Sequence, residues 1–208
     1  MGILLEACVG CYKEAKKAEL QGADRIELCD NLGEGGTTPS YGTIYLATQN
    51  INIPIAVIIR PRGGDFVYSN DEFEIMKKHI VICKELGVET VVFGILNKEN
   101  KIDIERTKEL IDLASGLKVT FHMAFDEIDD KFEALNQLIS MNVDRVLTKG
   151  CKTCALDGKN TLKNLVEKSD NRITILVGGG VTYKNYKELS NYIGCNEMHG
   201  SKIVGTLK

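Results

Sequence analysis

The sequence predicts an α/β fold, a closed (β/α)8 barrel that occupies residues 1–208 as a single domain. Strand-like and helix-like segments alternate along the whole chain, and alternation of this kind implies a parallel sheet. Eight strand-like segments share the 208 residues, a number that suits closure into a barrel. The alternative is a doubly wound open sheet, but no Gly-x-Gly-x-x-Gly motif follows the first strand-like segment.

The predicted strands are short apolar segments that stand between turns. They span residues 3–8, 25–29, 54–60, 90–93, 118–122, 145–148, 173–177 and 197–199. The first predicted helix ends at residue 21, and the others span residues 41–50, 71–86, 103–114, 130–141, 159–168 and 183–192. Gly87 follows helix 71–86 at the position where a glycine commonly ends a helix. Gly-Ala-Asp at 22–24 and Asn-Val-Asp at 142–144 mark turns from a helix into a strand.

The last helix of the barrel is predicted to be short or missing, because only nine residues follow His199. The seam between the last and first strands would then lack a cover, and an exposed apolar surface of this kind usually marks an interface. We therefore expect a homo-oligomer, most simply a dimer, in which a partner covers the seam with Ile203, Val204 and Leu207. The alternative is that the tail folds back over its own seam.

The composition indicates a cytosolic protein with a sizeable core. Hydrophobic residues make up 43% of the chain and charged residues 26%, and the net charge of −3 comes from well-mixed acidic and basic residues. There is no nucleic-acid footprint, no basic membrane patch and no apolar stretch near the length of a membrane span. The first residues lack the basic region of a signal peptide. Seven cysteines are an odd number, and a disulfide scaffold is not expected in the cytosol.

Two segments change abruptly from apolar strand to charge, imidazole and glycine, at residues 59–66 and 120–126. Packing gives no reason for such endings, so we expect a site at the carboxyl ends of the strands. Strand parity places a polar set on the inward face of the barrel. Its members are Glu6, Cys8, Arg25, Glu27, Cys29, Arg60 and His122. Buried charges must pair, so these residues bind either a ligand or one another, the second case being a structural ion network.

The thiols of Cys8 and Cys29 are expected to lie close together, because these residues end adjacent strands with the same parity. Soft thiolates in low coordination suit Cu(I). Cys11 and Cys8 also form a CxxC pair, as do Cys151 and Cys154, and two such pairs can hold zinc. Their separation of about 140 residues is far from the usual zinc spacing. The third alternative is that each cysteine is an inert packing residue.

A second group of residues suits an enzyme that acts on a small anionic or phosphorylated metabolite. Arg60 and Arg62 would hold the anion. His122 and Asp126 lie four residues apart where a strand gives way to a loop, and they could form an acid/base pair, with Glu27 as another candidate for proton transfer.

The glycines after the seventh strand suit the same enzyme. Gly178, Gly179 and Gly180 could cradle a phosphate with their backbone N–H groups, and the turn at His199 and Ser201 would supply the other half of the site. The alternative is a tight turn that needs glycine for its backbone conformation.

Several long motifs resemble the CutC family, the copper homeostasis proteins. These motifs are Glu-Ala-Cys at 6–8, Gly-Ala-Asp-Arg-Ile-Glu-Leu-Cys at 22–29, residues 35–40, Ile-Arg-Pro-Arg-Gly-Gly-Asp-Phe-Val-Tyr-Ser at 59–69, Val-Phe-Gly at 92–94, Thr-Phe-His at 120–122, Leu-Thr at 147–148 and the glycines at 178–180. The resemblance implies a TIM barrel, a cytoplasmic location, oligomeric assembly and a role in copper tolerance through Cu(I) binding. The ligands proposed for the family correspond to Cys8 and Cys29 here.

The chain departs from the family pattern at two site positions. Met123 stands where the family usually has arginine, and Lys149 stands where it usually has serine. A ligand contact of the lost arginine is therefore not expected, although Lys149 could replace its charge at the ligand. The leading interpretation is a Cu(I)-binding protein, the second is an enzyme, and the third is a scaffold that uses the bare barrel wall.

Overall fold

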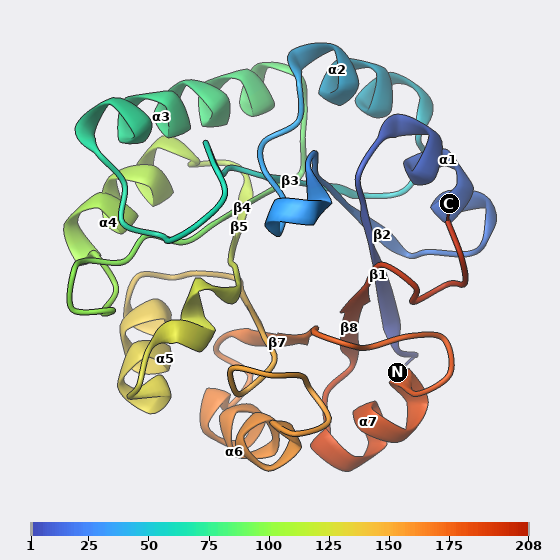
Figure 1. The fold of residues 1–208 in the computed structure, drawn as a ribbon, viewed down its shortest axis with the longest axis vertical. Helices are drawn as coiled ribbons and strands as arrows, with labels where there is room; N and C mark the ends of the chain where they lie inside the picture. The colour runs from blue at the N-terminus through green and yellow to red at the C-terminus, as the bar shows by residue number, and fades with distance from the viewer. Residues whose placement is uncertain (1, 208) are drawn as a thin grey trace.

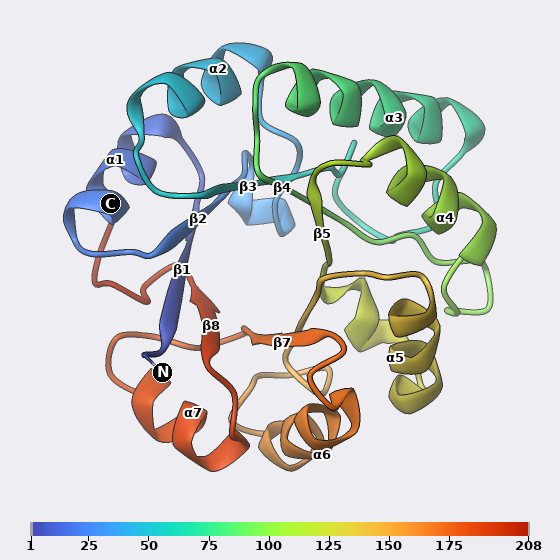
Figure 2. The same cartoon turned by 180° about the vertical axis from the view of Figure 1, so that it is seen from behind.

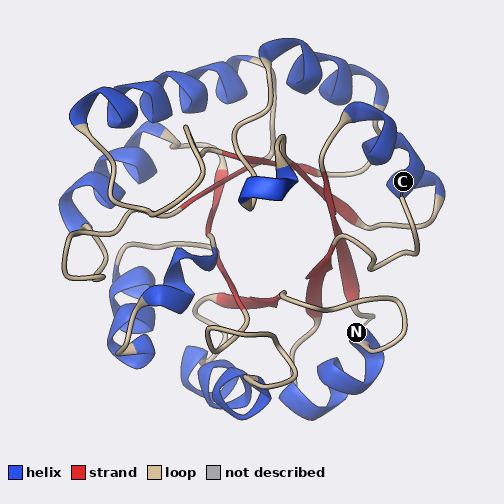
Figure 3. Cartoon of the chain, in the orientation of Figure 1, coloured by secondary structure: helices blue, strands red, loops and turns tan. Residues whose placement is uncertain are grey.

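The computed structural model describes residues 2–207 and confirms the predicted barrel. The strands are parallel and pair in chain order, and β1 pairs with β8 to close the ring. Figures 1 and 3 show them as an inner ring with the helices outside it. The strands are β1 (Leu4–Val9), β2 (Arg25–Leu28), β3 (Ile55–Ile58), β4 (Thr90–Phe93), β5 (Lys118–Phe121), β6 (Arg145–Thr148), β7 (Thr174–Val177) and β8 (Glu197–Gly200).

The helices form the outer layer, which Figure 2 shows from the opposite side. They are α1 (Tyr12–Leu20), α2 (Tyr41–Asn50), α3 (Asn70–Glu85), α4 (Ile104–Leu113), α5 (Lys131–Ser140), α6 (Lys159–Ser169) and α7 (Tyr186–Ile193), with 3-10 turns η1 (Leu32–Glu34) and η2 (Met123–Glu127). Polar side chains start several of them, as in α3, where Ser69 and Glu72 form a reciprocal capping box. Among the described residues, none of these helices has the length and apolar character needed to cross a membrane.

Strand parity divides the barrel as predicted. Ile26 and Leu28 of β2 belong to the apolar core, as do the alternate residues of β1. The inward-facing residues between them are polar, and the register of β1 and β2 pairs Glu6 with Arg25 and Cys8 with Glu27. The polar side chains of two neighbouring strands therefore lie side by side inside the ring.

The end of the chain replaces the missing eighth helix. Ile203 and Leu207 are buried, and Gly205 lies beside Gln21 at the end of α1. Figure 1 shows this tail running from β8 to the side of α1. The prediction of a bare seam is wrong, because the tail folds back over its own barrel.

Two predicted boundaries also differ from the structure. β3 ends at Ile58, because the backbone N–H of Arg60 turns to the hydroxyl of Thr38. α7 begins at Tyr186, later than predicted, because the side chain of Asn185 accepts from the N–H of Thr182 and holds a turn there. Both segments are loops at the carboxyl end of the barrel, where they shape the site.

Candidate functional site

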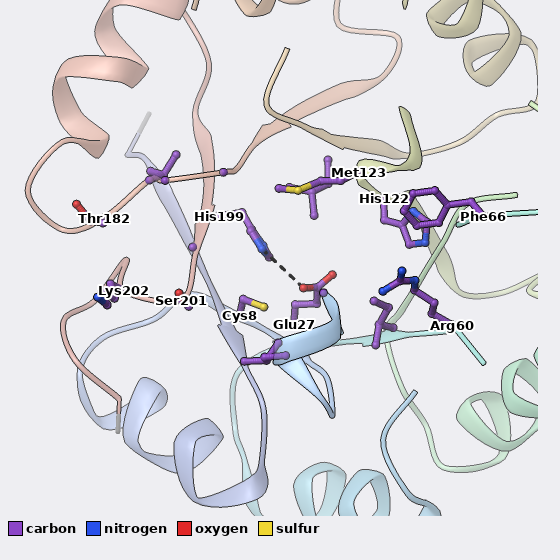
Figure 4. Close-up of a pocket in the computed structure, with 18 residues that line it drawn as sticks. Cys8, Glu27, Arg60, Phe66, His122, Met123, Thr182, His199, Ser201 and Lys202 are labelled. Carbon is purple, nitrogen blue, oxygen red and sulfur yellow. Dashed lines mark ion pairs between the residues drawn. The ribbon is translucent and has the colours of Figure 1, made fainter. Parts of the chain in front are cut away.

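A cavity of about 600 Å³ lies at the carboxyl ends of the strands. Figure 4 shows the residues that line it. Those predicted from the sequence are Cys8, Glu27, Arg60, His122, Gly179, Gly180, His199 and Ser201. Catalytic and binding sites of parallel barrels lie at this end, and the volume suits a small molecule.

Cys8, Glu27 and Cys29 form a compact cluster on one side of the cavity. The two sulfur atoms are 4.0 Å apart, and the thiol of Cys29 lies 3.5 Å from Oε2 of Glu27. One ligand atom from each of the three residues lies within 4.8 Å of the others. The cluster follows directly from the register, which sets Cys8 against Glu27, while Cys29 directly follows the strand that carries Glu27.

The two thiols of this cluster differ in acidity. The hydrogen bond with Cys29 lowers the pKa of Cys8 well below its usual value, and this outweighs burial, with a further contribution from His199. The same hydrogen bond, together with burial, raises the pKa of Cys29. Burial and the charge of Cys8 raise the pKa of Glu27 to about 8. Cys8 is thus the thiol that ionises first.

A buried ion network lies beside the cluster. Glu6 forms an ion pair with Arg25, and its other oxygen lies 2.8 Å from Nδ1 of His199. Glu197 bridges Arg25 and Arg145 at 2.6 and 2.9 Å. Glu6 does not line the cavity. Its contacts are those of a member of a structural ion network, the alternative to ligand binding that the sequence left open.

The network fixes the charge and orientation of His199. Burial favours the neutral ring, but the charge of Glu27 and the hydrogen bonds with Cys8 and Glu6 raise the pKa of His199 well above its usual value. Its Nε2 lies 3.7 Å from Glu27, the ion pair drawn in Figure 4. Burial also works against the ionised form of Glu6, but the hydrogen bond with His199 and the charge of Arg25 lower its pKa to about 2.

Arg60, Phe66 and His122 form the opposite side of the cavity (Figure 4). The guanidinium of Arg60 donates to three backbone carbonyls. Its central carbon, Cζ, lies 5.0 Å from the centre of the Phe66 ring. The rings of Phe66 and His122 are 4.9 Å apart. Nδ1 of His122 accepts a hydrogen bond from the N–H of Ala124. Burial and the nearby charge of Arg60 lower the pKa of His122 to about 3, so the ring is neutral.

Besides Glu6, five predicted site residues lie outside the cavity wall, namely Cys29, Arg62, Asp126, Lys149 and Gly178. Arg62 pairs with Glu72 on the outer side of its loop. Asp126 accepts from the hydroxyl of Thr148 and the N–H of Lys149, and it makes no hydrogen bond with a histidine. The predicted acid/base pair is therefore not formed. The ammonium group of Lys149 donates to a backbone carbonyl of its own loop rather than replacing a charge in the cavity.

The three glycines after β7 have separate structural reasons. A Cβ on Gly178 would lie 2.8 Å from the side-chain ends of both Leu147 and Met123, so close packing favours glycine at this position. Gly179 and Gly180 have φ values of 84° and 80°, which favour glycine. Packing and backbone conformation therefore explain the three glycines without a bound phosphate, although Gly179 and Gly180 do line the cavity.

Several contributors to the site were not predicted from the sequence. Thr182 and Lys202 line the cavity, and Arg145 and Glu197 complete the ion network. Strand parity could have identified the last two, because each begins a strand and faces inward. Phe66 lies within the polar segment 59–66, but its contacts with Arg60 depend on the fold of a loop.

A closed parallel barrel with its polar site at the carboxyl ends of the strands defines a TIM-barrel protein. More specifically, the chain belongs to the CutC family, whose model matches residues 3–204. It is 44% identical over 200 residues to the human copper homeostasis protein cutC homolog, covering 96% of this chain and 73% of that protein. It is also 44% identical over 201 residues to a CutC family protein of Porphyromonas gingivalis, covering 97% and 81% of the two chains.

Solved structures agree with this assignment. A putative copper homeostasis protein CutC from Streptococcus agalactiae superimposes with a TM-score of 0.93 at 40% identity, covering 97% of this chain and 99% of the other. A deoxyribose phosphate aldolase from Aeropyrum pernix gives a TM-score of 0.72 at 12% identity, covering 98% and 88% of the chains. The second similarity concerns the fold alone.

Proposed function

We propose that this protein takes part in copper homeostasis by binding Cu(I) between Cys8 and Cys29, with Glu27 as a third ligand. The observation that carries the proposal is the pair of sulfur atoms 4.0 Å apart beside a buried carboxyl group. Relatives named as copper homeostasis proteins support the same function. We also propose a cytoplasmic location, because the cytosol keeps thiols reduced and able to bind the metal.

The geometry of the cluster suits a small soft ion. Metal–sulfur bonds are about 2.3 Å long, so a metal bonded to both sulfurs would lie about 1 Å off the line that joins them, in a bent arrangement. Its third side would then face Glu27, whose oxygen belongs to the same compact group. Thiolates favour soft ions such as Cu(I), and a cluster of three ligand atoms offers the low coordination that suits this ion. The lowered pKa of Cys8 favours the thiolate that the metal requires.

The four-thiolate zinc site finds no support. Among residues 2–207, one group of three or more His, Cys, Asp or Glu side chains brings its ligand atoms close enough together to hold a metal ion. Its members are Cys8, Glu27 and Cys29. Cys11 is exposed, and the thiol of Cys151 hydrogen-bonds within its own loop, to the carbonyl of Cys154. The two CxxC pairs therefore do not converge on one ion.

Anaerobic titration of the reduced protein against a competing Cu(I) chelator tests the proposal. We expect one tightly bound Cu(I) in the wild type and none in the Cys8→Ser, Cys29→Ser double variant. Glu27→Gln should bind about tenfold more weakly, because a neutral amide is the poorer third ligand. Cys11→Ser is the matched control and should bind like the wild type. Unchanged affinity in the double variant, with its fold intact, would exclude these thiols as the site.

The enzyme interpretation remains a prediction with one supporting observation, the size of the cavity beside the thiols. Its acid/base pair does not exist in the structure, because Asp126 is bound to Thr148 instead of His122. Glu27 and His199 are the groups near the thiols that could move a proton. We therefore favour copper binding as the function of the thiol cluster.

A further inference from the structure

Arg60 is a buried cation without a counter-ion. The residue is 5% exposed, and in residues 2–207 no carboxylate lies within ion-pair distance of its guanidinium. Asp65 feels its charge, but this carboxylate is exposed to solvent and pairs with Arg62. Three carbonyls accept hydrogen bonds from the terminal nitrogens, while Nε has no partner at hydrogen-bond distance among residues 2–207. The buried hydroxyl of Tyr68 is the nearby neutral acceptor, since Arg60 opposes the rise that burial causes in the pKa of Tyr68. A buried charge without an opposite charge is unfavourable, so an anion beside Arg60 would be stabilised.

His122 provides a second donor without a partner. The residue is 4% exposed, and its Nδ1 accepts the hydrogen bond from Ala124. A neutral imidazole that accepts at one nitrogen carries its proton on the other. Nε2 of His122 is therefore an N–H donor, and it has no partner among the described residues. Unpaired buried donors are rare in folded proteins, and the two residues that carry these donors both line the cavity.

The two donors lie together in the cavity wall. Figure 4 shows Arg60 and His122 on the same side of the cavity, with Phe66 beside both. The contacts of the Phe66 ring with the two groups, at 5.0 and 4.9 Å, place them around one apolar surface. From these observations we propose that Arg60 and His122 bind the carboxylate of a small organic acid, whose carbon chain packs against Phe66 and the other apolar side chains of the cavity.

The donor set favours a carboxylate over a phosphate. One cation and one neutral N–H donor match the single charge of a carboxylate, whereas a phosphate dianion needs more donors to replace its water. The apolar side chains that line the cavity also suit a carbon chain. They are Leu32, Ile58, Phe66, Met123, Val181 and Leu147. A volume of about 600 Å³ leaves room for an acid larger than acetate.

This site is separate from the thiol cluster but opens into the same cavity. In Figure 4, Cys8, Glu27 and His199 lie across the cavity from Arg60 and His122. The carbon chain of a bound acid would therefore extend toward the thiols. Binding of the acid needs neither Cys8 nor Cys29, so the two proposals can fail independently.

The test measures binding of butyrate, with butyramide as its uncharged counterpart. The protein has three histidines, so selective ¹⁵N labelling gives a simple spectrum in which the Nε2–H of His122 can be followed. We expect butyrate to shift this signal in a saturable way and to raise the melting temperature, and butyramide to bind about tenfold more weakly or not at all. The Cys8→Ser, Cys29→Ser protein should bind butyrate like the wild type.

Variants separate the proposed contacts from general effects. His122→Asn keeps an acceptor for Ala124 but removes the Nε2 donor, and it should weaken butyrate binding about tenfold. Arg60→Gln should abolish binding, and His122→Asn decides the question if Arg60→Gln does not fold. Arg172→Gln is the matched control and should bind like the wild type, because this arginine lies between α6 and β7, outside the cavity wall. Equal binding of butyrate and butyramide, unchanged binding in His122→Asn, or a stronger response to inorganic phosphate than to butyrate would overturn the proposal.

Discussion

Single residues in the barrel mouth carry two separate kinds of chemistry. The sulfur atoms of Cys8 and Cys29 are close enough together to bind one soft metal ion. Arg60 and His122 each have one buried nitrogen, Nε and Nε2, without a hydrogen-bond partner among residues 2–207. Glu6 belongs to neither group, because it binds Arg25 and His199 beside the cavity. Its role is to hold His199 in place, and its effect should therefore appear in stability.

Glu6→Gln should destabilise the protein by about 3 kcal/mol at pH 7, because it removes one of the two carboxylate partners of the buried Arg25 and leaves only Glu197. The pKa of Glu6 is depressed to about 2 from an ordinary value of 4.5. Its stabilisation is thus present above pH 4.5 and disappears as the pH falls from 4.5 toward 2. Urea unfolding of both proteins between pH 2 and 8 checks this. A difference that stays constant across the acid range would show that Glu6 acts through packing alone.

The same measurements should show an alkaline limit. The pKa of His199 is raised in the folded protein. The stabilisation by its charged ring is therefore complete below pH 6.5, its ordinary pKa, and is lost as the pH rises through the higher pKa of the folded state. The wild type should therefore lose stability at both ends of the pH range. A stability that keeps rising above neutral pH would contradict the ion network described for His199.

Among the elements, the strand ends and the loops after them position the site. β1 and β2 bring the thiols together, and this much follows from strand parity in the sequence. The contacts of Arg62 and Asp126 could not be predicted in this way. Arg62 is held by carbonyls of its own loop and by Glu72 of α3, and Asp126 is held by the loop after β6. The same limit applies to Arg60, whose position was predicted but whose three carbonyl partners were not.

Gly94, directly after β4, should control the position of His122. A Cβ at this residue would lie 2.6 Å from Nδ1 of His122 and 3.0 Å from the side chain of Ala124. Gly94→Ala should therefore displace the imidazole, lower the free energy of unfolding by about 1–3 kcal/mol and weaken butyrate binding. Urea unfolding and the ¹⁵N-histidine spectrum measure both effects.

Gly42, in α2, supplies the matched control for this substitution. It has no heavy atom within 4 Å of an added Cβ, and its backbone is helical. Gly42→Ala should raise stability by about 0.5–1 kcal/mol and leave the spectrum of His122 unchanged. A wild-type position of the His122 signals in Gly94→Ala would show that the close contact does not orient the ring.

At the level of the whole molecule, the structure removes the uncovered seam from which a homo-oligomer was predicted. The seam between β8 and β1 is covered by Ile203 and Leu207 of the same chain, so no partner is needed there. The homo-oligomer remains a prediction without this support. Light scattering at micromolar concentration decides it, and a mass near 23.0 kDa would identify a monomer.

The fold itself was predictable because a barrel repeats one unit along the chain. The alternation of strands and helices and the parity of β2 are local properties of the sequence, and the closed ring follows from them. The path of the tail was not predictable in this sense, because its apolar residues suit a partner surface as well as the chain's own barrel.

X-ray absorption spectroscopy of the reduced, Cu(I)-loaded protein tests most directly whether the thiol cluster binds copper. We predict two sulfur neighbours from Cys8 and Cys29 and one oxygen neighbour from Glu27, with copper absent from the Cys8→Ser, Cys29→Ser protein. A copper site with three or more sulfur neighbours, with no sulfur, or with the same spectrum in the double variant would contradict it.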